Sequence, residues 1–325
     1  MKGRKKQYLI LFILILILFS LIILSKDLIY GEDNTIYKIS VIIRGKNSES
    51  WMITKEGIYQ AASDMNVDIN FITLSEDNNL DEQNRLIKRE IDAGVDALVI
   101  APVDSEKMSD TIESIKEKVS VVLIESTIQD LNKVPYVSCN NYLLGKMLAE
   151  EIIRSGNYRE KIAVINSSTS YNSVRERYRG FEDGIKESKN SYELVDINGE
   201  GIESIETSKK IIKDKNIDVV VTLEPSILEI FGQAKKELIE KYDKANDIEI
   251  YGVGSTSKII SLLEEDIINS IMVQNEFNVG YLGVQSAVDL IKGDKVNKKN
   301  IDFSVITKRN MYSDENQRLL FPFVR

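Results

Sequence analysis

The chain has 325 residues, with 42 Lys and Arg against 51 Asp and Glu for a formal net charge of −9, and it contains one cysteine and no histidine. The acidic balance argues against a nucleic acid as partner, because neutralising phosphates requires a basic surface, and the missing histidine removes the commonest general base and metal ligand. The single cysteine, Cys139, makes an intrachain disulfide impossible, and the length favours two domains.

The amino-terminal segment, residues 1–35, begins with basic residues and continues with the apolar run 8–24, which only Ser20 interrupts. This order places the basic end in the cytoplasm and the rest of the chain outside it. Two interpretations compete, a cleaved signal peptide and an uncleaved membrane anchor. A signal peptide has small residues before its cleavage site, whereas residues 22–24 are bulky, and the roughly 17 apolar residues reach the lower limit of a spanning helix. We therefore expect a protein anchored by an N-terminal transmembrane helix on the extracytoplasmic face of the cell membrane.

Further along, apolar segments typical of strands alternate with helical patterns, which indicates an α/β fold with parallel sheets covered by helices. In the first half the expected strands are 37–43, 68–74, 96–101, 119–124 and 135–139, and the expected helices are 51–65, 80–91, 105–118 and 141–154. The rhythm then restarts, with strands at 162–165, 193–197, 217–223, 248–253, 270–274 and 303–307 and helices at 174–186, 202–213, 226–241, 258–264 and 276–291. Two such sets predict two lobes.

Polar or turn-forming residues follow most of the expected strands. These segments are 44–48, 75–78, 102–105, 125–127, 166–168, 224–226 and 254–256. In open α/β sheets ligands bind outside the carboxyl ends of the strands. The recurrence of polar ends in both halves predicts two lobes that face each other across a polar cleft, although such residues also serve as helix N-caps.

Five segments, taken in this order, resemble the periplasmic sugar-binding proteins of the ribose-binding type, which are related to the effector domains of LacI-type repressors: ISVIIRGKNSESWMITKEGIYQAA, VDALVIAPVDSE, VVLIES, VSCNNYLLGKMLAEE and SVRERYRGFEDGI. The resemblance implies the type I periplasmic binding fold, with two Rossmann-like lobes. One lobe comprises residues 36–139 plus 275–302, and the other comprises residues 140–274 plus 303–325 with the tail. The three crossovers would form a hinge that closes on ligand binding. They are placed near Cys139 and Asn140, Gln274 and Asn275, and Asp302 and Phe303.

The resemblance also implies ligand-binding positions. After the first strand, Ser48 matches a polar hydrogen-bonding residue, and Trp51 matches an aromatic residue that stacks on a sugar ring, although Trp51 also suits a core position. Arg175 matches the family's ligand-binding arginine, whose planar guanidinium bridges two hydroxyl groups or a carboxylate. Its neighbours Arg177 and Arg179 are expected to be solvated or structural.

Four further positions complete the implied site. Glu125 retains an acceptor where the family has an aspartate, and Gln274 matches the family pattern. Glu224 stands in place of an asparagine, and Gly254 stands in place of an aspartate. Glu125 and Glu224 against Arg175 leave an uncompensated negative charge, which is costly to bury. We therefore expect a small sugar or sugar-like ligand. An amine on the ligand, a bound water or a cation would balance the negative charge, or else Glu224 turns to solvent.

No catalytic residue, cofactor or metal site is expected. Without histidine no activated nucleophile is evident, phosphate-binding glycine motifs are missing, and Glu125 and Glu224, the candidate pair for a glycoside-processing enzyme, fall in opposite lobes. Two binding roles stay open. One is the receptor of an ABC importer, which delivers its ligand to a permease; the other is a tethered sensing subunit, whose closed form is read by a sensor histidine kinase. The tail, residues 311–325, is expected to pack on a lobe, with docking to a partner as the alternative.

Overall fold

The computed structural model describes residues 12–17, 19–20, 36–46, 48–128, 131, 133–166, 171–197, 202–242 and 247–321. The chain forms two compact units, Met1–Tyr37 and Lys38–Arg325. In the first unit, residues 12–17 and 19–20 are helical and their side chains are exposed. No helix within the described ranges has both the length and the apolar character that crossing a bilayer requires. The rest of the predicted anchor, residues 8–11, 18 and 21–24, lies outside the described residues.

The second unit is built on two six-stranded sheets. The first has the strand order β11-β5-β4-β3-β1-β2, and its recorded pairs are parallel. Its strands are β1 (Lys38–Ile42), β2 (Asp68–Ile72), β3 (Ala97–Ile100), β4 (Ser120–Ile124), β5 (Tyr136–Cys139) and β11 (Lys299–Ile301). The central strand β3 is apolar and buried at every position because helices cover both faces of the sheet.

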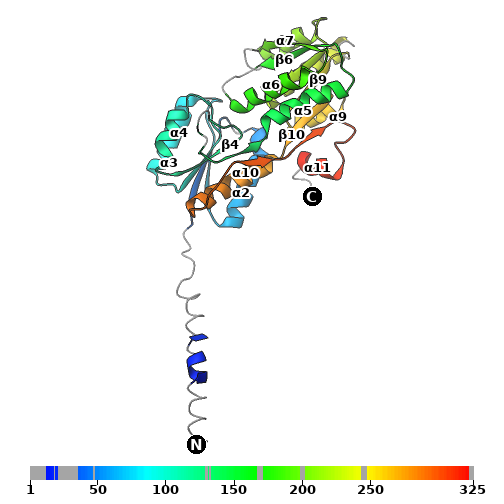
Figure 1. Cartoon of the computed structure of the whole chain (residues 1–325). Helices are drawn as coiled ribbons and strands as arrows, with labels where there is room; N and C mark the ends of the chain where they lie inside the picture. Colours follow the sequence, from blue (N-terminus) through cyan, green and yellow to red (C-terminus); the bar gives the residue numbers. More distant parts are fainter. Residues whose placement is uncertain are drawn as a thin grey trace, which may run out of the picture. The chain divides into compact units, whose positions relative to one another are not determined.

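Four helices flank this first sheet: α2 (Glu49–Met65), α3 (Leu80–Asp92), α4 (Ser109–Ile115) and α10 (Glu276–Ile291). α3 and α4 lie on one face, where Ile87 and Ile112 pack in a core cluster with strand residues such as Leu98, and α2 and α10 lie together on the other face (Figure 1). α2 and α10 cross closely at Gly57 and Gly280, where a side chain would collide with the backbone of the opposite helix. Glycine therefore permits the contact that positions the start of α10.

The second sheet has the strand order β12-β10-β9-β8-β6-β7. Its strands are β6 (Lys161–Asn166), β7 (Ser191–Asp196), β8 (Val219–Thr222), β9 (Glu249–Val253), β10 (Ser270–Gln274) and β12 (Phe303–Ile306). β12 pairs antiparallel with β10, whereas the other recorded pairs are parallel. The expectation of parallel sheets thus fails at this edge, because the chain reaches β12 directly from β11 without the helical crossover that a parallel return requires.

Six helices accompany the second sheet: α5 (Asn141–Arg154), α6 (Asn172–Ile185), α7 (Ile202–Ile212), α8 (Pro225–Tyr242), α9 (Ser257–Glu264) and α11 (Asp314–Leu320). α7, α8 and α9 contribute Ile212, Phe231 and Ile259 to one core cluster. α5 and α6 pack against each other through Gly145 and Gly180, each of which lies against the backbone of the opposite helix. This close packing fixes α6, whose first turns face the other lobe.

The chain passes between the two sheets three times: after Cys139 at the end of β5, after Gln274 at the end of β10, and at Asp302 between β11 and β12. Asn140 and Asn275 cap the helices that follow the first two crossings, since each side-chain oxygen accepts a hydrogen bond of 3.0 Å from the backbone N–H three residues on. Asn275 N also donates to Asp302 O at 3.2 Å, which ties two crossings together. That these segments act as a hinge stays a prediction.

The carboxyl-terminal tail contains a helix, α11, that the sequence patterns did not predict. Leu320 is buried, and Leu319 and Phe321 pack against the core cluster of the second lobe. The expectation that the tail packs on a lobe is therefore confirmed for the described residues up to 321. The alternative, in which the tail docks to a partner, stays a prediction, since Leu319 and Phe321 are only partly buried and Phe323 lies outside the described residues.

Candidate functional site

A cavity of about 410 Å³ lies where strands of both sheets end. This volume is within the range of small-molecule sites. Residues that follow β1, β2 and β4 line it from the first lobe, and residues that follow β6, β8 and β9 line it from the second. Of the seven ligand positions implied by the resemblance, six are among the lining residues: Ser48, Trp51, Glu125, Glu224, Gly254 and Gln274. The structure therefore brings these six together, and their role in ligand binding stays a prediction.

Arg175, the seventh position, is not among the described residues that line the cavity. Its Nη1 forms an ion pair of 2.8 Å with Glu106 Oε1. Arg177 lines the cavity instead: it is 4% exposed and donates to Asn141 Oδ1 and Leu223 O, both at 2.8 Å. Two positions along an α-helix correspond to a rotation of about 200°, so Arg175 and Arg177 leave opposite sides of α6. Arg175, which was expected to line the cleft, is thus not among the lining residues, and its role in ligand binding stays a prediction. Arg177, which was expected to be solvated or structural, is structural through its two hydrogen bonds and also lines the cavity.

Arg44 is a lining residue that sequence reasoning missed. Its guanidinium carbon lies 5.3 Å from the centroid of the Trp51 ring and 4.5 Å from that of Tyr171, which are cation–π distances. Its Nη2 is 3.8 Å from Glu125 Oε2, and its buried Nη1 has no hydrogen-bond partner among the described residues. Burial also raises the pKa of Tyr171 to about 12, so that this phenol stays neutral. A basic residue directly after the first strand, inside the polar loop 44–48, was the available signal.

Two carboxyl groups meet at the inner end of the cavity. Gln274 Nε2 donates to Glu125 Oε1 at 2.6 Å and to Glu276 Oε1 at 2.9 Å, and Thr54 Oγ1 donates to Glu276 Oε2 at 3.3 Å. Burial, and then the neighbouring charge of Glu125, hold the pKa of Glu276 well above its ordinary value. Glu276, the first residue of α10, was not predicted as a site residue because it reads as an ordinary acidic residue in the first turn of a helix.

The backbone around Glu125 is held in an uncommon conformation. Its φ is 66°, in the left-handed region that residues other than glycine adopt rarely. Tyr136 Oη and Ser138 Oγ both donate to the Glu125 carbonyl at 3.1 Å, which secures this conformation.

Cys139, next to this cluster, is buried, and burial raises the pKa of its thiol to about 11, so that it is an unreactive neutral thiol at neutral pH.

Gly254 contributes only backbone to the cavity. Its φ is 143°, and an added Cβ would meet Ile259 and Pro225. A side chain at this position, such as the aspartate of the sugar-binding pattern, would therefore require the neighbouring loop to move. The departure from the pattern at Gly254 thus has a local steric reason.

Hydrogen bonds join the two lobes around the cavity. Ser257 N, at the start of α9, donates to Glu49 Oε1 at 2.8 Å, and Asn172 N, at the start of α6, donates to Ser105 Oγ at 2.9 Å. Ser173 N donates to Ser126 Oγ at 3.2 Å. Helix amino termini of the second lobe are thus satisfied by side chains of the first, which is a complementary contact between the lobes.

The charged side chains that line the cavity are mostly acidic. Among the described lining residues, six are carboxylic (Glu49, Asp77, Glu125, Glu224, Glu229 and Glu276) and two are basic (Arg44 and Arg177). The cavity therefore has a larger acidic excess than the one carboxylate that the sequence predicted. Such an excess favours a ligand with hydrogen-bond donors.

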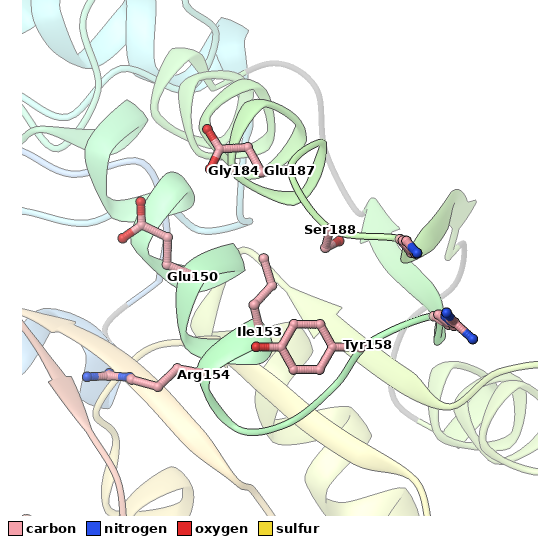
Figure 2. A pocket seen from close by; sticks show the side chains of 9 residues that line it. Glu150, Ile153, Arg154, Tyr158, Gly184, Glu187 and Ser188 are labelled. Carbon is pink, nitrogen blue, oxygen red and sulfur yellow. The ribbon is translucent and has the colours of Figure 1, made fainter.

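A second cavity, of about 640 Å³, opens on the surface of the second lobe between the ends of α5 and α6. Figure 2 shows its labelled side chains, among them Glu150, Arg154 and Tyr158, which are exposed. It contains no residue that the sequence predicted as a ligand position, and charges of both signs are mixed along it. We therefore place the candidate site in the cavity between the lobes.

Comparisons with known proteins agree with this architecture. The ribose import binding protein RbsB of Bacillus subtilis is 23% identical over 270 residues, which cover 81% of this chain and 84% of that protein. A carbohydrate transporter solute-binding protein from Agrobacterium radiobacter, solved in complex with D-arabinose, superposes with a TM-score of 0.81 at 19% identity and covers 88% of this chain and 99% of that one. A structure described as the XylFII-LytSN complex superposes with a TM-score of 0.75 at 22% identity, over 84% and 98% of the two chains.

The model of one protein family, described as the periplasmic binding protein domain, matches residues 39–295. This range runs from β1 to just beyond α10, so it includes two of the three crossings and the described residues that line the cavity, but not β11 and β12. The fold, the position of the cavity and the matched range lead to the same conclusion: the chain belongs to the periplasmic binding protein family and is a binding protein, not an enzyme.

Proposed function

We propose that this protein is an extracytoplasmic solute-binding protein that captures a small sugar or sugar-like ligand between its two lobes. The observation that carries the proposal is the cavity between the strand ends of both sheets, where Trp51 and Tyr171 supply aromatic surface. Aromatic faces suit the apolar C–H surface of a sugar ring. Arg44, Glu125 and Gln274 supply donors and acceptors for its hydroxyl groups. The ribose and arabinose ligands named for the similar proteins are of the same class.

Ligand capture would proceed by closure of the lobes about the three crossings at Cys139–Asn140, Gln274–Asn275 and Asp302–Phe303. Each crossing is short, and two of them begin a capped helix. Short segments between rigid elements are suited to absorb a rotation. On this proposal residues 36–139 and 275–302 move as one lobe and residues 140–274 and 303–325 as the other.

Delivery to an ABC permease is the role that we favour for the closed form. Both curated relatives are ribose import binding proteins. We further propose that residues 8–24 anchor the protein to the membrane without cleavage, so that it stays close to its partner. Cell fractionation tests this step: the full-length protein should be found in the membrane fraction with its amino terminus intact, and a shorter, released protein would contradict it.

A second candidate function is that of a membrane-tethered sensing subunit, whose closed form is read by a sensor histidine kinase. The similarity to the XylFII-LytSN complex favours this candidate. A reciprocal co-purification separates the two roles. Recovery of a permease with the tagged, ligand-loaded protein supports import, and recovery of a histidine kinase supports sensing.

The proposed sugar binding is tested by calorimetry on the full-length protein in detergent micelles, titrated with D-ribose, D-arabinose, D-glucose and D-galactose. Trp51→Ala should weaken binding of the sugar that binds by about 10-fold or more, because a ring-stacking surface is lost. Tyr59→Ala is the matched control, since Tyr59 lies on the same helix and is 42% exposed. Equal dissociation constants for the Trp51 variant and the wild type would contradict the placement of the sugar in this cavity.

A further inference from the structure

Two buried polar atoms in the cavity lack hydrogen-bond partners within the described residues: Arg44 Nη1 and Gln274 Oε1. Gln274 is 5% exposed, and its Nε2 is fixed by donation to both Glu125 and Glu276, so Oε1 is left as a buried acceptor. A buried polar atom without a partner is costly. The cavity therefore lacks a donor at Gln274 and an acceptor at Arg44, and both positions lie beside the Glu125 carboxylate.

The inner end of the cavity is acidic, and the two arginines that line the cavity contact mainly uncharged groups. Arg177 donates to Asn141 Oδ1 and Leu223 O. Arg44 lies between two aromatic rings, with 3.8 Å between its Nη2 and Glu125. Glu276 accepts hydrogen bonds from neutral groups, namely the amide of Gln274 and the hydroxyl of Thr54. Among the described residues, the ion pair recorded for these two carboxyl groups is therefore the 3.8 Å contact of Arg44 with Glu125, and Glu276 has none.

Three of the four remaining acidic side chains of the cavity accept hydrogen bonds from groups outside this pair. Glu49 accepts hydrogen bonds from Ser257, Asp77 accepts one from Lys46 N, and Glu229 accepts one from Thr256. In the described part of the chain, neither these three acidic residues nor the residues that donate to them have a buried polar side-chain atom without a hydrogen-bond partner. The unmet demand for a donor is therefore localised at Gln274, between Glu125 and Glu276.

We infer that the ligand is an amino sugar or a similar polyhydroxylated amine, whose ammonium group binds at the Glu125–Gln274–Glu276 cluster. This inference rests on the proposed function, since it concerns the same cavity. An ammonium group has three donors, which match Gln274 Oε1 and the two carboxyl groups. A hydroxyl or ring oxygen near the amine of the same molecule accepts from Arg44 Nη1, with the ring beside Trp51.

A metal ion is a poorer occupant than an ammonium group. The described residues contain no group of three His, Cys, Asp or Glu side chains arranged to hold a metal. The cluster contributes two carboxyl groups and one amide oxygen, and the remaining lining includes the apolar surface of Trp51, Tyr171 and Val174. This mixture suits an organic cation with an apolar face.

The test is a calorimetric comparison on the full-length protein in detergent micelles. The neutral sugars D-glucose and D-galactose are paired with D-glucosamine and D-galactosamine, and N-acetyl-D-glucosamine controls for the size of the substituent without its charge. We expect the amino sugars to bind at least 10-fold tighter than their neutral partners. The diamine 1,4-diaminobutane, which lacks hydroxyl groups, should bind at least 10-fold more weakly than the better amino sugar.

Substitution of Glu125 tests whether the preference for amino sugars arises at this cluster. Glu125→Gln should weaken amino-sugar binding by at least 10-fold more than it weakens neutral-sugar binding, because both ligands lose a hydrogen-bond acceptor but only the amino sugar loses a charge partner. Glu56→Gln, on the exposed face of α2, removes one carboxylate elsewhere and should change neither. If Glu125→Gln fails to fold, as judged by its thermal transition, the wild-type ratio of amino-sugar to neutral-sugar affinity decides by itself.

The outcomes distinguish this inference from the proposed function. Neutral sugars that bind as tightly as the amino sugars would overturn the inference and leave sugar binding intact. Tight binding of the diamine would also overturn it, because the hydroxyl groups would then be dispensable. Failure of all the sugars to bind would overturn both.

Discussion

The interior of the cleft and its rim use the same charged residue types under opposite conditions. In the interior, Arg177 is 4% exposed, and Glu125 and Glu276 share the amide of Gln274. At the rim, the Arg175 and Glu106 side chains form an ion pair while 30% and 62% exposed. Water screens the rim pair, whereas every interior group depends on its protein neighbours for solvation. Substitutions in the interior should therefore have larger consequences than chemically equal substitutions at the rim.

The largest effect is expected from Arg177→Met. The substitution keeps an apolar stem of similar length but leaves Asn141 Oδ1 and Leu223 O without their guanidinium donor in a buried region. Each unsatisfied buried acceptor costs about 1–3 kcal/mol, so the free energy of unfolding should fall by about 3 kcal/mol. Chemical denaturation by urea measures this loss. Arg177→Lys retains the charge but not the planar guanidinium, so its free energy of unfolding should lie between those of the wild type and of Arg177→Met.

The second effect is expected at the buried acid pair, through Glu276→Gln. In the folded state the pKa of Glu276 lies above its ordinary value of 4.5, so above pH 4.5 the folded protein holds more protons than the unfolded chain. Stability from this group is thus fully present below pH 4.5 and declines as the pH rises through the raised pKa. Glu276→Gln should remove this decline, so that at a pH above the raised pKa of Glu276 the variant is more stable than the wild type.

Thermal unfolding of both proteins across a pH series, without ligand, checks this prediction. The exposed variant Glu113→Gln, on α4, serves as the control for loss of a carboxylate. Parallel stability curves for the wild type and Glu276→Gln would show that Glu276 does not retain its proton.

The smallest effect is expected from Arg175→Ala at the rim. An exposed ion pair contributes about 0–1 kcal/mol, so the free energy of unfolding should change by less than about 1 kcal/mol. Glu106→Ala should give a similar change, and the double variant should be little worse than either. The difference in free energy of unfolding between the wild type and Arg175→Ala should be smaller still at high salt, because exposed charges are screened. A loss as large as that of Arg177→Met would remove the distinction between interior and rim.

Much of the fold was predictable from the sequence because it follows from local patterns. The expected strands 96–101 and 217–223 correspond to β3 and β8, which lie buried in the centres of the two sheets. The polar residues after these strands indicated the edge at which the cavity lies, and six of the seven implied ligand positions line it. The strand β11 escaped prediction because three residues are too few to show a period, and the helix α11 did so because its first five residues are all polar.

The choice between Arg175 and Arg177 could not be made from the sequence. Both residues lie in the first turns of α6, and only the rotation of the helix about its axis decides which one enters the cleft. Gly145 and Gly180 set that rotation through the close contact of α5 with α6. Arg44 and Glu276 were missed for a related reason, since the first is recognised by its position between two rings and the second by its distance from Glu125.

The amino-acid order by itself determined that this protein has two α/β lobes with polar strand ends, because strand and helix periodicity and turn chemistry are properties of neighbouring residues. The tertiary structure alone decided which charged side chains are buried together. Glu125, Gln274 and Glu276 meet only because the chain crosses between the lobes beside them and α10 packs back on the first sheet. Burial and proximity, which set the pKa of Glu276 and the demand for a donor at Gln274, arise from that packing.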